Sequence, residues 1–200
     1  MRTIGITGGI ASGKSAVCDL LSGYSQIDAD LVSREVVAPG TPGLAKIANV
    51  FGKRMLLPDG GLDRAKLRNT IAKEEDAQQT LNQILHPLIL ASIREKLNRL
   101  ETAGTPVALV SAALMIETGS YRNYDKVVLV TAPYTLRLRR LLERDGMDEA
   151  TARQLMDKQW PDERKRTFAD GEIVNDGDMD RLKERTEAAM AQLGFGFPGP

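Results

Sequence analysis

Three short runs of mainly apolar residues stand out along the chain, at 3–7, 107–111 and 127–131. Each run is continuous instead of alternating with polar positions, which is typical of strands buried on both faces of a parallel sheet. Two weaker strands are predicted at 26–28 and 172–174. Helical spacing of apolar positions lies between these runs, so strands and helices alternate. We expect an α/β fold of three layers, with a five-stranded parallel sheet between helices and a ligand at the carboxyl ends of the strands.

The alternation is interrupted between the second and third predicted strands. The apolar positions there follow a helical spacing, at Leu81, Ile84, Leu85, Leu88 and Ile89. We predict that Asp63 caps one helix and that Pro87 marks a helix break or a new first turn. A helical insertion at this place would overhang the ligand end of the sheet. We therefore expect a core formed by 1–30 and 106–200, and an insertion over 31–105 that binds a second substrate.

A charged segment follows the predicted strand at 127–131. Its sequence, RLRRLLERDGMDEATARQLMDKQWPDERKR, is helical by spacing, with interruptions at Gly146 and Pro161. Its place after a core strand favours a helical lid over 137–170 that brings arginines onto phosphates, and a solvated helical hairpin is the alternative. The C-terminal stretch GFGFPGP is expected to fray.

The stretch GITGGIASGKS, residues 5–15, has the spacing Gly-x-x-x-x-Gly-Lys-Ser of a P-loop. Its glycines let backbone N–H groups approach anionic oxygens without Cβ clashes. Lys14 can reach the β- and γ-phosphates of a nucleotide, and the Ser15 hydroxyl can bind Mg²⁺. A strand precedes the motif and a helix follows it, which is the context that phosphate binding needs. The expected contacts to ATP are made by Gly9, Ile10, Ala11, Ser12, Gly13, Lys14, Ser15 and Ala16.

Two aspartates follow the predicted second strand, Asp28 and Asp30. Phosphoryl transfer needs the γ-phosphate held in line, its charge neutralised, and the acceptor hydroxyl oriented and relieved of its proton. A carboxylate at the end of this strand is well placed for the last task, while the other helps to hold Mg²⁺. The alternative is a cap for the helix that begins near Leu31, and a cap and a catalyst are compatible.

Composition narrows the class of protein. Twenty-seven basic and 27 acidic residues give a formal charge of zero, so nothing points to nucleic acid as a partner. We find no apolar run of membrane-spanning length and no signal-peptide pattern at the N-terminus. One cysteine, Cys18, excludes an intrachain disulfide, and one histidine gives little support to a metal cluster. We expect a cytoplasmic protein without membrane partners, monomeric but with weak self-association left open.

Several stretches occur in a specific order: TGGIASGKS, IDAD, VAPGTPGLAKIANVFG, DGGLDRAKLR, LNQILHPLI, ERD, QWPDERKRTFAD and IVNDG. With them the chain resembles dephospho-CoA kinase from residue 3 to about 177. Many families share the P-loop, whereas IDAD at this distance, LDR-x-x-LR and HP together are more specific. The resemblance implies ATP-dependent phosphorylation of the ribose 3′-hydroxyl of dephospho-CoA, the last step of coenzyme A synthesis, with Mg²⁺ as cofactor.

The resemblance also implies roles for individual residues. Asp30 would be the base for the 3′-hydroxyl, acting with Lys14 and Arg140 in catalysis. Arg140 and Arg144 would serve the nucleotide and the transferring phosphate from the lid, and Asn175 would lie near the adenine. Lys165 matches a basic position of the family. The dephospho-CoA site would be formed by Asp28, Asp30, Arg34, Leu62, Arg64, Arg68, His86 and Glu117.

Other interpretations of these residues stay open. Arg68 can be an ordinary surface arginine, Asn175 a turn residue, and His86 a structural residue at a helix boundary. Arg140 and Arg144 lie four apart on one helical face, where they can point together at an anion. Asp145 and Glu143 offer them structural partners instead.

The chain departs from the family's pattern at two places. Ala11 stands where the family usually has glycine, and alanine disfavours a positive φ. A strained turn at this position would weaken tight phosphate contact. The segment 113–117 reads Ala-Leu-Met-Ile-Glu, without the proline and phenylalanine of the usual P-L-L-F-E. That change bears on the acceptor site more than on the reaction type.

Two other functions compete with this interpretation. Another P-loop kinase, for a nucleoside monophosphate or a sugar acid, would share the loop, the lid and the carboxylate, but the insertion with LDR and HP argues against it. A GTPase switch should carry D-x-x-G and N-K-x-D, and neither string occurs. LSGYSQ at 21–26 loosely echoes a motif of ABC ATPases, but it lies too close to Ser15 to reach a partner's nucleotide. We interpret it as the end of the first helix.

Overall fold

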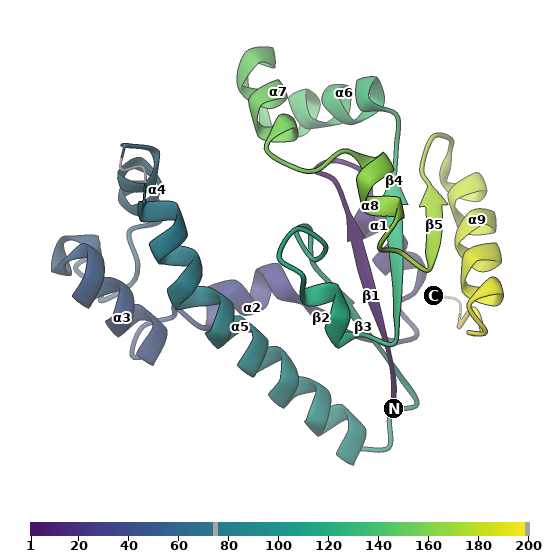
Figure 1. Ribbon diagram of the computed structural model, residues 1–200, viewed down its shortest axis with the longest axis horizontal. Helices are drawn as coiled ribbons and strands as arrows, with labels where there is room; N and C mark the ends of the chain where they lie inside the picture. The colour runs from purple at the N-terminus through teal and green to yellow at the C-terminus, as the bar shows by residue number, and fades with distance from the viewer. Residues whose placement is uncertain (74–75, 199–200) are drawn as a thin grey trace. The chain divides into compact units, whose positions relative to one another are not determined.

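The computed structural model describes residues 1–73 and 76–198. Its strands are β1 (Arg2–Gly8), β2 (Ser25–Asp28), β3 (Val107–Ser111), β4 (Lys126–Thr131) and β5 (Gly171–Val174). Its helices are α1 (Lys14–Leu20), α2 (Ala29–Glu35), α3 (Pro42–Phe51), α4 (Arg64–Lys73), α5 (Ala77–Thr102), α6 (Tyr134–Asp145), α7 (Glu149–Asp157), α8 (Asp162–Arg166) and α9 (Met179–Gln192), with short 3-10 turns at Lys53–Met55 and Ser120–Asn123. Figure 1 shows this order along the chain.

The five strands form one sheet in the order β2-β3-β1-β4-β5. β1 pairs in parallel with both β3 and β4, and β4 pairs in parallel with β5. Ile4 pairs with Leu109 on one side and with Lys126 on the other. All five strands were predicted, three from continuous apolar runs and two as weaker strands, and the predicted five-stranded α/β fold is confirmed.

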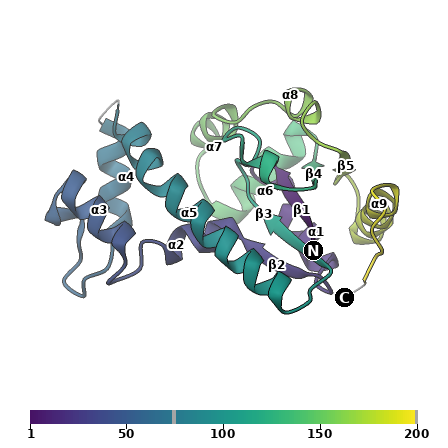
Figure 2. The ribbon, with the colours of Figure 1, turned by 60° about the horizontal axis from the view of Figure 1, so that its bottom comes forward.

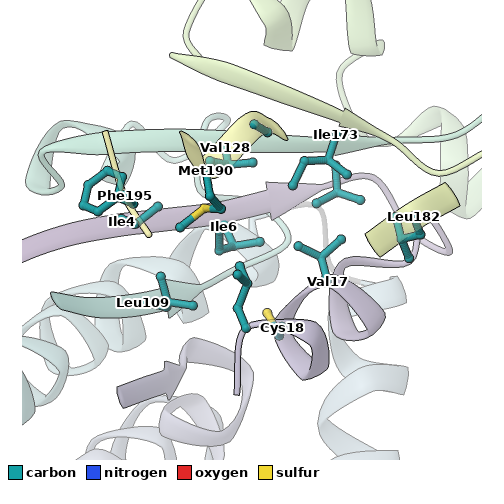
Figure 3. Close-up of a cluster of buried hydrophobic side chains, with 13 residues drawn as sticks. Ile4, Ile6, Val17, Cys18, Leu109, Val128, Ile173, Leu182, Met190 and Phe195 are labelled. Carbon is teal, nitrogen blue, oxygen red and sulfur yellow. The ribbon is translucent and has the colours of Figure 1, made fainter. Parts of the chain in front are cut away.

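The larger hydrophobic core lies on one face of the sheet, under α1 and α9 (Figure 3). α9 runs beside β5 and also contacts α1 (Figure 2). Strand residues such as Ile4, Ile6 and Val128 are fully buried against the two helices. Cys18 belongs to this cluster, where it packs as a small buried residue. The core fixes β1 and α1, and with them the two ends of the P-loop.

The altered segment at 113–117 packs against the other face of the sheet. Met115 and Ile116 are fully buried, whereas Leu114 is exposed. A Cβ on Gly5 of β1 would lie 2.5 Å from the sulfur of Met115. Met115 therefore fills the space that this glycine leaves, so the segment is well packed without proline and phenylalanine.

The C-terminal tail does not fray over its described residues. Phe195 is buried in the core cluster, and the guanidinium carbon of Arg2 lies 3.8 Å from the centroid of its ring. Nη1 of Arg2 donates to the carbonyl oxygen of Gly194 at 3.0 Å, and the Tyr24 hydroxyl donates to that of Gly196. For residues 194–198 the expectation of fraying is wrong, because Phe195 buries apolar surface and the backbone carbonyls find donors. The last two residues of that stretch lie outside the described part of the chain.

The chain divides into two compact units, Asp28–Arg99 and the remaining Met1–Ile27 with Leu100–Pro200. The smaller unit has its own core, in which Val37, Ile47, Met55 and Leu67 are buried. The functional division of the chain into a nucleotide-binding core, an insertion and a lid stays a prediction.

Asp63 caps α4, as predicted. Its Oδ1 accepts from the N–H of Lys66 at 2.9 Å. Pro87, in contrast, does not break its helix, because α5 runs through it from Ala77 to Thr102. A proline inside a helix removes one hydrogen bond to the residue four before it, here Gln83. Both residues are exposed, so water can satisfy the freed carbonyl.

The charged segment after β4 is interrupted where the sequence predicted. α6 ends at Asp145 with Gly146 as a left-handed cap, and α8 begins directly after Pro161. Among the described residues, no helix is long and apolar enough to cross a membrane.

Candidate active site

The P-loop motif lies between β1 and α1, as its sequence requires. β1 ends at Gly8 and α1 begins at Lys14. The N–H of Ser12 donates to the carbonyl oxygen of Gly9 at 3.0 Å and closes the turn. Gly13 precedes the helix with a φ of 94°, a conformation that glycine adopts without Cβ strain.

The glycines of the loop are needed because other parts of the chain approach it closely. A Cβ on Gly9 would lie 2.2 Å from Nη2 of Arg137, and one on Gly13 would lie 1.9 Å from Nδ2 of Asn175. Real Cβ atoms essentially never approach other atoms so closely. Tertiary contacts therefore hold the loop in shape.

Ala11 adopts the positive φ that the sequence argument identified as a source of strain. Its φ is 59°, and it is the one non-glycine residue with a positive φ in the described ranges. The left-handed conformation costs an L-residue roughly 1–2 kcal/mol. The strained turn is therefore present in the middle of the P-loop.

The loop has the donor groups that a nucleotide phosphate requires. Ser12 is 1% exposed, and no hydrogen-bond partner of its hydroxyl occurs within residues 1–73 and 76–198. A buried polar atom of this kind is normally satisfied, so it fits a phosphate oxygen. Lys14 is half-buried, Ser15 is exposed, and Ala16 packs on the core.

Ser15 is the candidate ligand that the loop offers to a magnesium ion. The described part of the chain holds no group of three or more His, Cys, Asp or Glu side chains suited to a metal. Mg²⁺ commonly takes few protein ligands and completes its shell with phosphate oxygens and water. The exposed hydroxyl of Ser15 at the start of α1 suits that kind of site.

Two of the predicted site residues, Asn175 and Arg140, come together at the P-loop. Nδ2 of Asn175 donates to the carbonyl oxygen of Ser12 at 2.9 Å, and Nη2 of Arg140 donates to Oδ1 of Asn175 at 3.3 Å. Asn175 is 6% exposed. It follows β5, and its own N–H donates to Thr131 at the end of β4. Two strand ends thus bring one buried amide to the loop.

Arg137 and Gln159 also contact the P-loop, and neither was among the predicted site residues. Nε of Arg137 donates to the carbonyl oxygen of Ile10 at 2.9 Å, and the N–H of Ile10 donates to Oε1 of Gln159 at 2.7 Å. Arg137 is 7% exposed and forms an ion pair with Asp162 at 3.4 Å. Burial raises the pKa of the Asp162 carboxyl, and the nearby Arg137 opposes that shift. The sequence did carry a signal for Arg137. It lies one and four positions before Leu138 and Leu141, the buried apolar residues of α6, and so on their side of the helix.

Glu117 lies beside Lys165, which is fully buried. Nζ of Lys165 is 2.9 Å from Oε1 of Glu117, and the N–H of Trp160 donates to the same oxygen at 3.3 Å. The pair joins the segment after β3 to α8. Glu117 was predicted to bind substrate, and its pairing supports a structural role as well.

Arg144 is bound to its neighbour. Its Nε and Nη2 donate to the two carboxylate oxygens of Asp145 at 2.6 and 2.8 Å. This pairing holds the pKa of Asp145 below its usual range. Arg144 is therefore not directed at the P-loop with Arg140, and its part in nucleotide binding stays a prediction.

The two aspartates after β2 have different positions at the start of α2. Asp28 is the N-cap, and its Oδ1 accepts from the N–H of Asp30 at 2.7 Å. Asp30 lies in the first turn and is exposed, as is Arg34 near the end of the helix. The capping alternative thus holds for Asp28, while the carboxylate of Asp30 is exposed to solvent.

The remaining predicted substrate residues lie in the same small unit. Leu62 is half-buried against its core and pairs with Leu56 in an isolated antiparallel bridge. Arg64 and Arg68 are exposed four residues apart on α4, and His86 is exposed on α5 rather than at a helix boundary.

Comparison with known proteins gives a consistent family match. The family model for dephospho-CoA kinase matches residues 2–181. A dephospho-CoA kinase of Corynebacterium glutamicum is 40% identical over 195 residues, covering 96% of this chain and 98% of its own length. One of Streptomyces avermitilis is 43% identical over 197 residues, covering 96% and 94%.

Solved structures agree with this match. Dephospho-CoA kinase from Campylobacter jejuni superposes with a TM-score of 0.72 at 26% identity, covering 96% of this chain and 98% of its own. TT1252 from Thermus thermophilus gives 0.80 at 29% identity, covering 96% and 97%. Shikimate kinase from Acinetobacter baumannii, with 0.54 at 17% identity over 97% and 94%, shares the fold alone.

Proposed function

The chain belongs to the dephospho-CoA kinase family, and we propose that it transfers the γ-phosphoryl group of ATP to the ribose 3′-hydroxyl of dephospho-CoA, giving coenzyme A and ADP. The observation that carries this proposal is the extent of the family match, from residue 2 to 181. It includes the unit Asp28–Arg99 as well as the P-loop. The sequence match therefore extends well beyond the P-loop, which kinases with other acceptors share.

The P-loop binds the phosphates of ATP in this proposal. Its N–H groups and the ammonium of Lys14 neutralise the charge of the transferring group, and Arg140 adds a further cation beside Asn175. Ser15 would hold Mg²⁺, which would supply positive charge to offset the charge of the phosphate oxygens.

We assign to Asp30 the role of the base that takes the proton of the acceptor hydroxyl. Asp28 is engaged as the helix cap, whereas the carboxylate of Asp30 is exposed at the first turn of α2. Of the two aspartates, Asp30 is thus the better candidate for a general base. Asp28 orients this turn.

The acceptor site and the lid follow from the family resemblance. Dephospho-CoA would contact Arg34, Leu62, Arg64, Arg68, His86 and Glu117, and the segment 137–170 would close over the phosphates to exclude water. Arg144 would reach the nucleotide after leaving Asp145. The protein would work in the cytoplasm as a monomer, with weak self-association left open.

A panel of acceptors tests the proposed function. We would follow ADP release from MgATP with dephospho-CoA, AMP, CMP, shikimate, gluconate or no acceptor. The proposal predicts turnover that depends on dephospho-CoA. Comparable or faster turnover with another acceptor would still indicate a kinase but would reject dephospho-CoA as its substrate.

A further inference from the structure

Both backbone groups of Ile10 are hydrogen-bonded to side chains from the segment that follows β4. Its N–H donates to Gln159, which lies between α7 and α8, and its carbonyl oxygen accepts from Arg137 in α6. The two bonds, 2.7 and 2.9 Å long, hold Ile10 from two sides. Gln159, Ile10 and Arg137 all belong to the larger compact unit.

The Arg137 side chain is itself fixed. Its guanidinium lies directly against Gly9, where a Cβ would come within 2.2 Å of Nη2. Nη1 lies 3.5 and 3.4 Å from the two carboxylate oxygens of Asp162, the first residue of α8. A buried guanidinium is costly unless it is paired and hydrogen-bonded, and this one has both kinds of partner.

Apolar contacts hold the same part of the loop. The side chains of Ile10 and Ala11 pack on a cluster formed by α6 and α7. That cluster consists of Leu138, Leu141, Ala152 and Met156. Ile10 and Ala11 are therefore anchored to these two helices by side chains and by the backbone.

Ala11 supplies the reason why such anchoring is needed. Its φ of 59° disfavours every residue with a Cβ, and a strained conformation persists only where surrounding contacts determine it. The hydrogen bonds of Arg137 and Gln159 and these apolar contacts converge on Ile10, the residue directly before Ala11.

We propose that Arg137 and Gln159 are positioning residues of the P-loop, which hold Ile10 so that Ala11 keeps its left-handed conformation and the loop stays formed for the nucleotide phosphates. The proposal rests on the function proposed above. It makes no use of the acceptor, since it concerns the loop that binds the nucleotide.

A double-variant experiment tests this inference. MgADP affinity is measured by calorimetry for Arg137→Met and Gln159→Leu, each with and without Ala11→Gly. Arg137 and Gln159 together are called the clamp. Loss of either side chain should weaken MgADP binding about five- to thirtyfold, the factor that corresponds to left-handed strain at one alanine. In each clamp variant Ala11→Gly should restore most of the loss, because glycine adopts the conformation without strain. In the wild-type background, Ala11→Gly should change affinity less than about twofold, since the clamp already holds the loop.

Arg139→Met is the matched control, since Arg139 lies on the same helix with its side chain 69% exposed. It should bind MgADP as the wild type does. The Gln159→Leu pair keeps the test informative if Arg137→Met fails to fold, which thermal unfolding would reveal. Wild-type affinity in both clamp variants, or no recovery with Ala11→Gly, would overturn the proposal. MgADP binding needs no acceptor, so failure of the proposed activity is distinguished from failure of this inference.

Discussion

The side-chain amide of Asn175 donates to the carbonyl oxygen of Ser12 at 2.9 Å, across 163 positions of the sequence. The same side chain accepts from Arg140. One buried amide therefore connects the P-loop to the end of β5 and to an arginine of α6. This connection explains how a phosphate-binding loop and a cationic side chain are held in a common arrangement before any ligand binds.

Replacing Asn175 should weaken both the fold and nucleotide binding. Asn175→Ala leaves the Ser12 carbonyl without its donor, and a buried unsatisfied group costs about 1–3 kcal/mol. We expect a loss of that size in the free energy of unfolding in urea, together with weaker MgADP binding. Asn49→Ala, on an exposed position of α3, is the control and should change neither quantity. Unchanged MgADP affinity in Asn175→Ala would separate Asn175 from the nucleotide site.

Replacing one member of the buried pair Lys165 and Glu117 should lower the free energy of unfolding more than replacing both members together. Lys165→Met leaves the Glu117 carboxylate without its cation, and Glu117→Gln leaves a fully buried ammonium. We expect each single variant to lose about 3–5 kcal/mol of unfolding free energy. The double variant should lose much less than the sum, which urea unfolding measures.

A half-exposed ion pair provides the comparison for this effect. Lys126 and Asp170 also approach to 2.9 Å, but with 38% and 35% of their side chains exposed. Lys126→Met should cost about 0–1 kcal/mol. Additive losses in the Lys165 and Glu117 variants would contradict coupling between the two charges.

Replacing Asp30 should reduce turnover without affecting nucleotide affinity. Asp30→Asn removes the proposed base, so we expect kcat to fall by about 10²–10⁴ while calorimetry with MgADP gives the wild-type affinity. Glu35→Gln is the matched control, because Glu35 is an exposed carboxylate on the same helix without a proposed role in the reaction. An equal loss of kcat in Glu35→Gln, or normal turnover in Asp30→Asn, would reject the assignment.

The stability of the larger unit should depend on Asp125 in acid. Its Oδ2 accepts from the N–H and hydroxyl of Thr3 at 2.7 and 2.8 Å, and these bonds hold the pKa of Asp125 below its usual value. The stabilisation is therefore present above the unfolded pKa, about 3.9, and is lost as the pH falls through the folded pKa. Asp125→Asn should be less stable than the wild type at pH 7, and the difference should shrink below about pH 4. Urea unfolding across this range would contradict the account if the difference were constant.

The sheet and the P-loop were predictable because their signals are local. Continuous apolar runs mark the buried strands, and the spacing of glycine, lysine and serine marks the loop. The cap of α4 by Asp63 and the end of α6 at Gly146 followed from single-residue preferences. Such features need no knowledge of which distant segments meet.

The features that were missed depend on tertiary contacts. Pro87 stays within α5, where the residue four before it, Gln83, is exposed, and Phe195 is buried in the core. The clamp on Ile10 joins residues that are more than a hundred positions apart. The sequence predicted that a positive φ at Ala11 would strain the loop, but it did not predict the contacts that hold the turn.

The identity of the product tests the central claim most directly. The purified protein would be incubated with MgATP and dephospho-CoA, and the product examined by mass spectrometry and phosphorus NMR. The account predicts one added phosphoryl group, located on the ribose 3′-oxygen, in equal amount to the ADP formed. A phosphoryl group on another oxygen, or ADP without a phosphorylated acceptor, would contradict it.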